Sequence, residues 1–211
     1  MKNIKKFHLN VATYFFFLLS FLCGYFKQTL FIFIIIVVHE FGHIIMIHLC
    51  KYKFLKVEFF PFGGLTHIDK PINSSINKEI LIAISGVISQ IFLGLILIFL
   101  KERCLTYNNY LLFQTYNFTI LIFNLLPIIP LDGSIILHSI LEKILPYKKA
   151  FFVYEIFSAL FFLVFLYLNI ILHLDNYFIC GVLITQFILL KKQEKYIIRR
   201  FFLERTLKEY P

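Results

Sequence analysis

Long apolar runs recur along the chain and constrain its fold more than any other feature. A helix needs about 20 mostly apolar residues to cross the roughly 30 Å hydrocarbon core of a bilayer. Six runs approach this length, the last being the shortest, and they comprise residues 7–26, 30–49, 80–100, 110–129, 151–172 and 177–190. The chain is 60% hydrophobic and 16% charged, which excludes a soluble enzyme or a disordered tail. The sequence therefore predicts an all-α membrane protein with about six transmembrane helices within residues 1–190.

The Lys and Arg residues are unevenly distributed among the segments that connect these runs. With the N-terminus placed in the cytoplasm, 18 of the 21 Lys and Arg residues fall in inside segments and three in outside segments. This asymmetry predicts a multi-pass protein of the cell membrane with both termini cytoplasmic. The net charge of +9 then lies in loops beside the membrane, where it attracts anionic lipid head groups. The bilayer is therefore an expected partner, and nucleic acid is not. Residues 191–211 form a basic, amphipathic segment that we expect along the cytoplasmic face.

The longest polar interval between apolar runs covers residues 51–79. It contains KVEFFPFGGLTHID, in which short alternating segments flank Gly63 and Gly64. Glycine pairs of this kind favour a hairpin turn. We therefore expect a short β-hairpin or re-entrant segment between the second and third membrane helices. It is open whether this hairpin is a plain surface loop or offers a strand edge to a bound peptide.

The second apolar run, FIFIIIVVHEFGHIIMIHLC, carries ionisable residues at membrane depth. His39 and His43 are four residues apart, so both imidazoles project from one helix face and can bind one ion. Glu40 lies about 100° round the helix, where it can reach a metal-bound water without being a ligand. This is the HExxH arrangement of zinc hydrolases. The alternative is that these His and Glu residues are only hydrogen-bonded to neighbours inside a helix bundle and bind no metal.

A catalytic zinc site usually has three protein ligands. Asp132 follows an apolar run that Pro127 and Pro130 must break, and a broken helix at depth is tolerated where protein or a water-filled cavity satisfies its backbone. Asp132 is therefore a candidate third ligand. The alternative is that it only caps the next helix.

The segments HEFGH at 39–43 and NLLPIIPLDG at 124–133 resemble the paired signatures of the site-2 protease family of intramembrane zinc metalloproteases. This resemblance implies one zinc ion per chain, held by His39, His43 and Asp132, with Glu40 as catalytic base. It also implies that Asn124 and the loop from Pro127 to Pro130 receive the substrate. The hairpin glycines Gly63 and Gly64 are further candidates for substrate binding.

The segments PFGG at 61–64 and RRFFLERTLKEY at 199–210 are similar to the sporulation branch of this family. That likeness implies a membrane-associated precursor as substrate, such as a pro-sigma factor, and inhibitory membrane proteins as partners. It places the protein on the mother-cell side of the forespore membrane if the organism sporulates. The branch carries a nucleotide-binding CBS domain after its membrane region, which we do not expect within residues 1–211. The rival functions are a membrane metal-ion transporter and a catalytically silent membrane scaffold.

Overall fold

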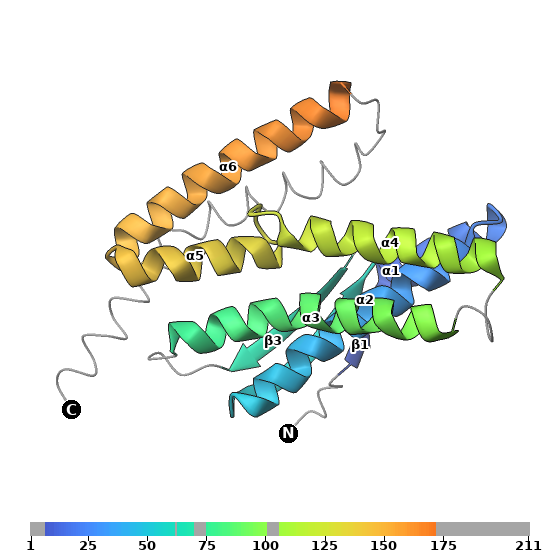
Figure 1. Ribbon diagram of the computed structural model, residues 1–211, viewed down its shortest axis with the longest axis horizontal. Coiled ribbons are helices and arrows are strands. Elements are labelled where there is room, and N and C mark those ends of the chain that lie inside the picture. Colours follow the sequence, from blue (N-terminus) through green and yellow to red (C-terminus); the bar gives the residue numbers. More distant parts are fainter. Residues whose placement is uncertain (1–6, 62, 70–74, 101–105, 172–211) are drawn as a thin grey trace. The chain divides into compact units, whose positions relative to one another are not determined.

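The fold is mostly helical, with one small sheet (Figure 1). This computed structural model describes residues 7–61, 63–69, 75–100 and 106–171. In chain order the described elements are β1 (Phe7–Leu9), α1 (Val11–Leu22), α2 (Phe26–Leu49), β2 (Lys53–Phe60), β3 (Gly63–Asp69), α3 (Ile76–Leu100), α4 (Tyr107–Leu125), α5 (Asp132–Ile144) and α6 (Tyr147–Ile171). The predicted helical membrane architecture is confirmed, and the expected hairpin lies between α2 and α3. The sixth apolar run and the segment 191–211 lie outside the described residues.

Three of the described helices are long and apolar enough to cross a membrane. They are Phe26–Leu49, Ile76–Phe99 and Tyr147–Ile171. Each begins a few residues before the corresponding apolar run, because helix propagation adds a backbone hydrogen bond for every residue included. Many large apolar side chains on these helices are exposed, as expected for surfaces that face lipid. The chain is a membrane protein.

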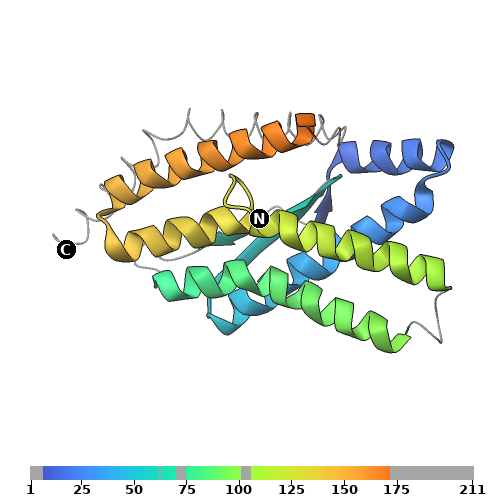
Figure 2. The same ribbon diagram turned by 45° about the horizontal axis from the view of Figure 1, so that its top comes forward.

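The first apolar run is not one membrane helix, so that prediction is wrong. Residues Phe7–Leu9 form a strand, and α1 contains only 12 residues. A helix of this length extends about 18 Å, which is less than the hydrocarbon core. Asn10 separates the two elements. Its side chain caps α1, and its backbone N–H donates to the Phe59 carbonyl oxygen of β2 at 3.0 Å. After α1 the chain bends sharply into α2 through Gly24, whose φ is 77° (Figure 2).

The sheet has the strand order β1-β2-β3. Strand β1 runs parallel to β2, with Phe7 opposite Val57, and β2 runs antiparallel to β3, with Phe60 opposite Gly63. The hairpin prediction is therefore confirmed, although a third strand joins it. Strand β2 ends at Phe60 and β3 begins at Gly63, so Gly63 and Gly64 belong to β3 rather than to the turn. A glycine is needed at position 64 of this strand because Glu40 of α2 leaves no space there for a side chain.

One face of the sheet packs on α2. Val57 and Phe59 of β2 form a buried cluster with Ile36 and Ile44 of α2. On the exposed part of the same strand, Lys56 and Glu58 form an ion pair. A hydrogen bond from Lys56 to the Glu58 carboxylate lowers the pKa of Glu58. The apolar face of β2 thus packs the hairpin against the helix that carries the HExxH segment. The charged side chains alternate with the apolar ones and lie on the opposite face.

The chain divides into two compact units, residues 1–70 with 81–123, and residues 71–80 with 124–211. In the second unit α6 turns back from the end of α5 and packs against it (Figure 1). The fourth apolar run was expected to continue to Ile129, but α4 ends at Leu125. Pro127 explains this end, because proline disfavours helical backbone in the residue before it.

Candidate metal centre

Helix α2 places two imidazoles side by side. His39 and His43 are 5% and 6% exposed, and their ring centroids are 4.6 Å apart with the ring planes at 84°. Their Nε2 atoms lie 3.0 Å from each other. The predicted i, i+4 pairing of the two histidines on one helix face is therefore present in the structure.

The other ring nitrogen of each histidine has an oxygen partner. His43 Nδ1 lies 2.7 Å from the backbone carbonyl oxygen of Ile82, and His39 Nδ1 lies 3.0 Å from Gln90 Oε1. Both partner atoms are oxygens, with which a protonated Nδ1 forms a hydrogen bond. In that tautomer of the neutral imidazoles the two Nε2 atoms present lone pairs to each other, and a shared cation satisfies both. Neutral imidazole nitrogens are ordinary zinc ligands, and the pair fits such an ion.

Helix α3 leaves room for both rings at Gly86. A Cβ atom at this position would lie 2.5 Å from His39 Cε1 and 2.6 Å from His43 Nε2. Real Cβ atoms do not approach other atoms so closely, so any side chain at this position would displace the imidazoles. Gly86 stands between Ile82 and Gln90 at helical spacing of four, and these three residues line the histidine pair.

Glu40 is 5% exposed and lies under strand β3. Thr66 Oγ1 donates a hydrogen bond to Glu40 Oε2 at 2.6 Å. A Cβ at Gly64 would lie less than 3.0 Å from the Cγ and Cδ atoms of Glu40, closer than real Cβ atoms approach. The carboxylate is thus held from the hairpin side by one hydroxyl and one glycine, while its neighbour His39 contacts α3.

Asp132 belongs to the second unit, where it is the first residue of α5. The N-cap of α5 is Leu131, so capping by the Asp132 side chain does not account for this aspartate. A carboxylate in the first helical turn is favoured by the helix dipole. Next to it, Gly133 packs so tightly on the Leu125 carbonyl group that a Cβ would clash.

The loop before α5 holds the remaining candidates. Asn124 and Pro127 are partly buried, whereas Pro130 is exposed and follows a cis peptide bond. Ile129 anchors the loop, since it is 3% exposed and its amide donates to Ser158 Oγ of α6 at 2.9 Å. Asn124, the proline loop and Asp132 are therefore consecutive features of the second unit, and the HExxH residues with Gly63 and Gly64 are features of the first.

The sequence matches peptidase family M50 over residues 27–105 and 102–168, which include both signature segments. The chain belongs to peptidase family M50, the site-2 protease family. The resemblance predicted from the motifs is thereby confirmed. Membership explains why ionisable residues occupy an apolar helix, because the family is one of membrane metalloproteases.

Three M50 relatives are informative. The chain is 32% identical over 148 residues to Stage IV sporulation protein FB of Bacillus subtilis, covering 70% of this chain and 51% of that protein. It is 31% identical over 123 residues to zinc metalloprotease MJ0392 of Methanocaldococcus jannaschii, covering 56% and 35%. The solved site-2 protease from Methanocaldococcus jannaschii is similar with a TM-score of 0.61 and 27% identity, covering 88% of this chain and 93% of that one. The chain spans about half or less of the length of the two curated relatives.

Sequence reasoning missed three residues that contact the M50 signature in this fold, namely Thr66, Gly86 and Gln90. Thr66 and Gly86 carry no local signal, since both are ordinary in a strand and a membrane helix. Gln90 does carry one, because it is a polar residue in the middle of the apolar run 80–100.

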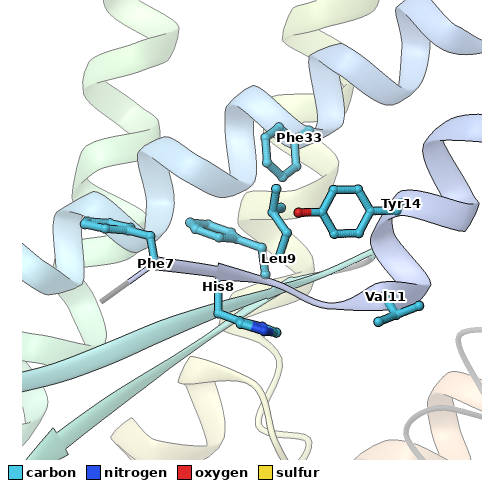
Figure 3. Close-up of a pocket in the computed structure, with 7 residues that line it drawn as sticks. Phe7, His8, Leu9, Val11, Tyr14 and Phe33 are labelled. Atoms are coloured by element: carbon cyan, nitrogen blue, oxygen red, sulfur yellow. The ribbon is translucent and has the colours of Figure 1, made fainter. Parts of the chain in front are cut away.

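A cavity of about 430 Å³ lies apart from these M50 signature residues, between β1, α1 and α2 (Figure 3). Its walls are mostly apolar and aromatic, and they comprise Phe7, His8, Leu9, Val11, Tyr14, Phe33 and Phe59. Tyr14 reaches from α1 towards Leu9 and Phe33. Neither the HExxH residues nor the hairpin glycines line this cavity.

Proposed function

We propose that this chain is a zinc-dependent intramembrane endopeptidase that hydrolyses a peptide bond in or near the membrane segment of a protein substrate. The observation that carries the proposal is the histidine pair, in which both Nε2 atoms face each other and both Nδ1 atoms are engaged by acceptors. Two imidazole nitrogens 3.0 Å apart can share one cation, and zinc is a cation that neutral imidazoles commonly bind. Membership of a peptidase family supports the same conclusion.

His39, His43 and Asp132 are the ligands in this proposal. Two imidazole nitrogens and one carboxylate form a common donor set for catalytic zinc and leave a position for water. Asp132 suits the role because it starts a helix and does not act as its N-cap. One zinc ion per chain is proposed.

Zinc bound by these residues supplies Lewis acidity, which polarises the scissile carbonyl group and acidifies a water. Glu40 is the general base, and its carboxylate accepts the proton of the attacking water. It then returns that proton to the nitrogen of the leaving amine. Thr66 orients the carboxylate by its hydrogen bond, which leaves Glu40 Oε1 for the proton transfer. The nearly complete burial of Glu40 keeps bulk water from competing.

Substrate binding is assigned to both units. A peptide bond in an intact helix has its carbonyl group hydrogen-bonded, so the substrate must be extended locally. Asn124 offers an amide that can bond an extended backbone, and Pro127 and Pro130 shape the loop beside it. Strand β3, with Gly63 and Gly64, is an edge of the sheet, to which an extended peptide can add as a further strand.

The physiological assignment is also part of this proposal. The match to Stage IV sporulation protein FB supports a sporulation role, with a membrane-associated precursor such as a pro-sigma factor as substrate and inhibitory membrane proteins as partners. Both termini are cytoplasmic in the proposed topology. Reporter fusions at Lys70 and at the C-terminus should then read as cytoplasmic and a fusion near Asp175 as external. The opposite pattern would refute this orientation.

The decisive experiment combines zinc content with cleavage of a co-expressed precursor. Glu40→Gln should retain zinc and lower cleavage by about 10²-fold to 10⁴-fold, because it removes only the base. Asp132→Asn should lower both zinc content and cleavage. Full proteolysis by either variant would refute the residue assignment, and zinc flux through proteoliposomes without proteolysis would favour a transporter.

A further inference from the structure

Gln90 is a fully buried amide in the middle of a membrane helix. Its exposed fraction is 0%, and apolar residues make up most of the surrounding helix α3. Burying an amide away from water costs free energy unless a hydrogen bond compensates for it. Its carbonyl oxygen, Oε1, lies 3.0 Å from His39 Nδ1, so the side chain contacts a residue of the HExxH segment.

The orientation of this amide determines the tautomer of His39. With Oε1 towards the ring, Nδ1 must be the protonated nitrogen and Nε2 the one with the lone pair. With the NH₂ group towards the ring, Nδ1 would accept and Nε2 would carry the proton, which prevents it from binding a metal. An acceptor atom that faces His39 Nδ1 therefore suffices to select the metal-binding tautomer of His39.

Two features keep Gln90 in place. Asn117 of α4 donates from Nδ2 to the backbone oxygen of Gln90 at 3.0 Å, which ties this turn of α3 to α4. Gly86, one turn earlier, lets α3 approach the two imidazoles closely. His43 obtains its acceptor from the Ile82 backbone instead, so of these two acceptors only Gln90 is a side chain that mutation can remove.

We propose that Gln90 is a positioning residue that holds His39 in the zinc-binding tautomer. The inference rests on the proposed zinc site and adds the side chain that orients one of its ligands. Groups that orient metal ligands in this way usually contribute about tenfold to a hundredfold to metal affinity. Gln90 acts on His39 alone and touches neither substrate nor Glu40 in this account.

The test compares Gln90→Met, which keeps the length and removes the acceptor, with Gln90→Glu, which keeps an acceptor. Zinc affinity is measured on purified full-length protein by competition with a chelator, and the melting temperature of the metal-free protein is measured in parallel. Gln114→Met is the matched control, because Gln114 donates to the Gly94 carbonyl group away from the histidines. Gln90→Met should bind zinc about tenfold to a hundredfold more weakly. Gln90→Glu and Gln114→Met should stay close to the wild type.

Each other outcome has a definite meaning. If Gln90→Met binds zinc as tightly as the wild type, or if Gln90→Glu loses as much affinity as Gln90→Met, the inference is wrong. Should Gln90→Met fail to fold, Gln90→Leu replaces it as the variant without an acceptor, and zinc affinity equal to the wild type in that variant refutes the role. A wild-type chain that binds no zinc would refute the proposed function as well, which separates the two failures.

Discussion

Thr66 Oγ1 donates a hydrogen bond to Glu40 Oε2 at 2.6 Å, which connects strand β3 to the acidic residue of the HExxH segment. The two residues are 26 positions apart in sequence. Because β3 is also the proposed substrate-binding edge, a peptide that adds to this strand would lie beside the residue that positions the base. The hydroxyl thus joins substrate binding to catalysis in the proposed enzyme.

Thr66→Val should lower kcat and leave KM nearly unchanged, because valine keeps the shape of threonine and loses only the donor. A hydrogen bond to a charged group contributes about 1.5–3 kcal/mol, which corresponds to roughly a tenfold to hundredfold lower rate. Thr66→Ser should restore most of it. Thr115→Val is the control, since the Thr115 hydroxyl bonds within its own helix to the Leu111 carbonyl group. Equal rates for Thr66→Val and the wild type would contradict this role.

Gly64→Ala should destabilise the hairpin and displace Glu40, because the added methyl group would lie less than 3.0 Å from Glu40 Cγ and Cδ. Overpacking of this kind costs about 1–3 kcal/mol. Gly63→Ala offers a matched comparison, since a Cβ there has no neighbouring atom within 4 Å. Thermal unfolding of the two variants checks the prediction, and a lower melting temperature is expected for Gly64→Ala alone. Equal melting temperatures would show that the close approach of Gly64 to Glu40 is absent.

Gly86→Ala should weaken zinc binding by about tenfold or more, because its Cβ would push both imidazoles out of position. Gly63→Ala is the control, since a Cβ there has no neighbouring atom within 4 Å. Chelator competition on both variants measures the difference. A zinc affinity for Gly86→Ala that equals that of Gly63→Ala would refute the proposed packing of α3 on the histidine pair.

Ser158→Ala should destabilise the second unit, because it leaves the buried Ile129 amide without its acceptor. An unsatisfied buried amide costs about 1–3 kcal/mol. Ser139 is a suitable comparison, being equally buried, with a hydroxyl that has no hydrogen-bond partner among the described residues. Ser139→Ala should therefore be neutral in chemical denaturation. The opposite ranking of the two alanine variants would disprove this account of the loop.

Several features follow from local sequence alone. The pairing of His39 with His43 was predictable, because an i, i+4 spacing places two side chains on one face of any helix. The end of α4 near Pro127 was predictable for a similar reason, since proline constrains the residues directly before it. The α1 start at Asn10 had a local signal too, a capping residue before an apolar segment, which the length of the apolar run obscured.

What only the tertiary structure decided are contacts between residues distant in sequence. Gln90 and Ile82 lie 51 and 39 positions from the histidines whose Nδ1 atoms they contact. Strand β1 forms because residues 7–9 pair with the edge of β2, about 50 positions later in the sequence. The hydropathy of the sequence contains no information on that pairing. The sequence by itself thus determined which residues can bind a metal, because that depends on chemistry and helical spacing. The fold decided which oxygen atoms contact these residues and how closely they are packed, because that depends on backbone and side-chain groups from distant parts of the chain.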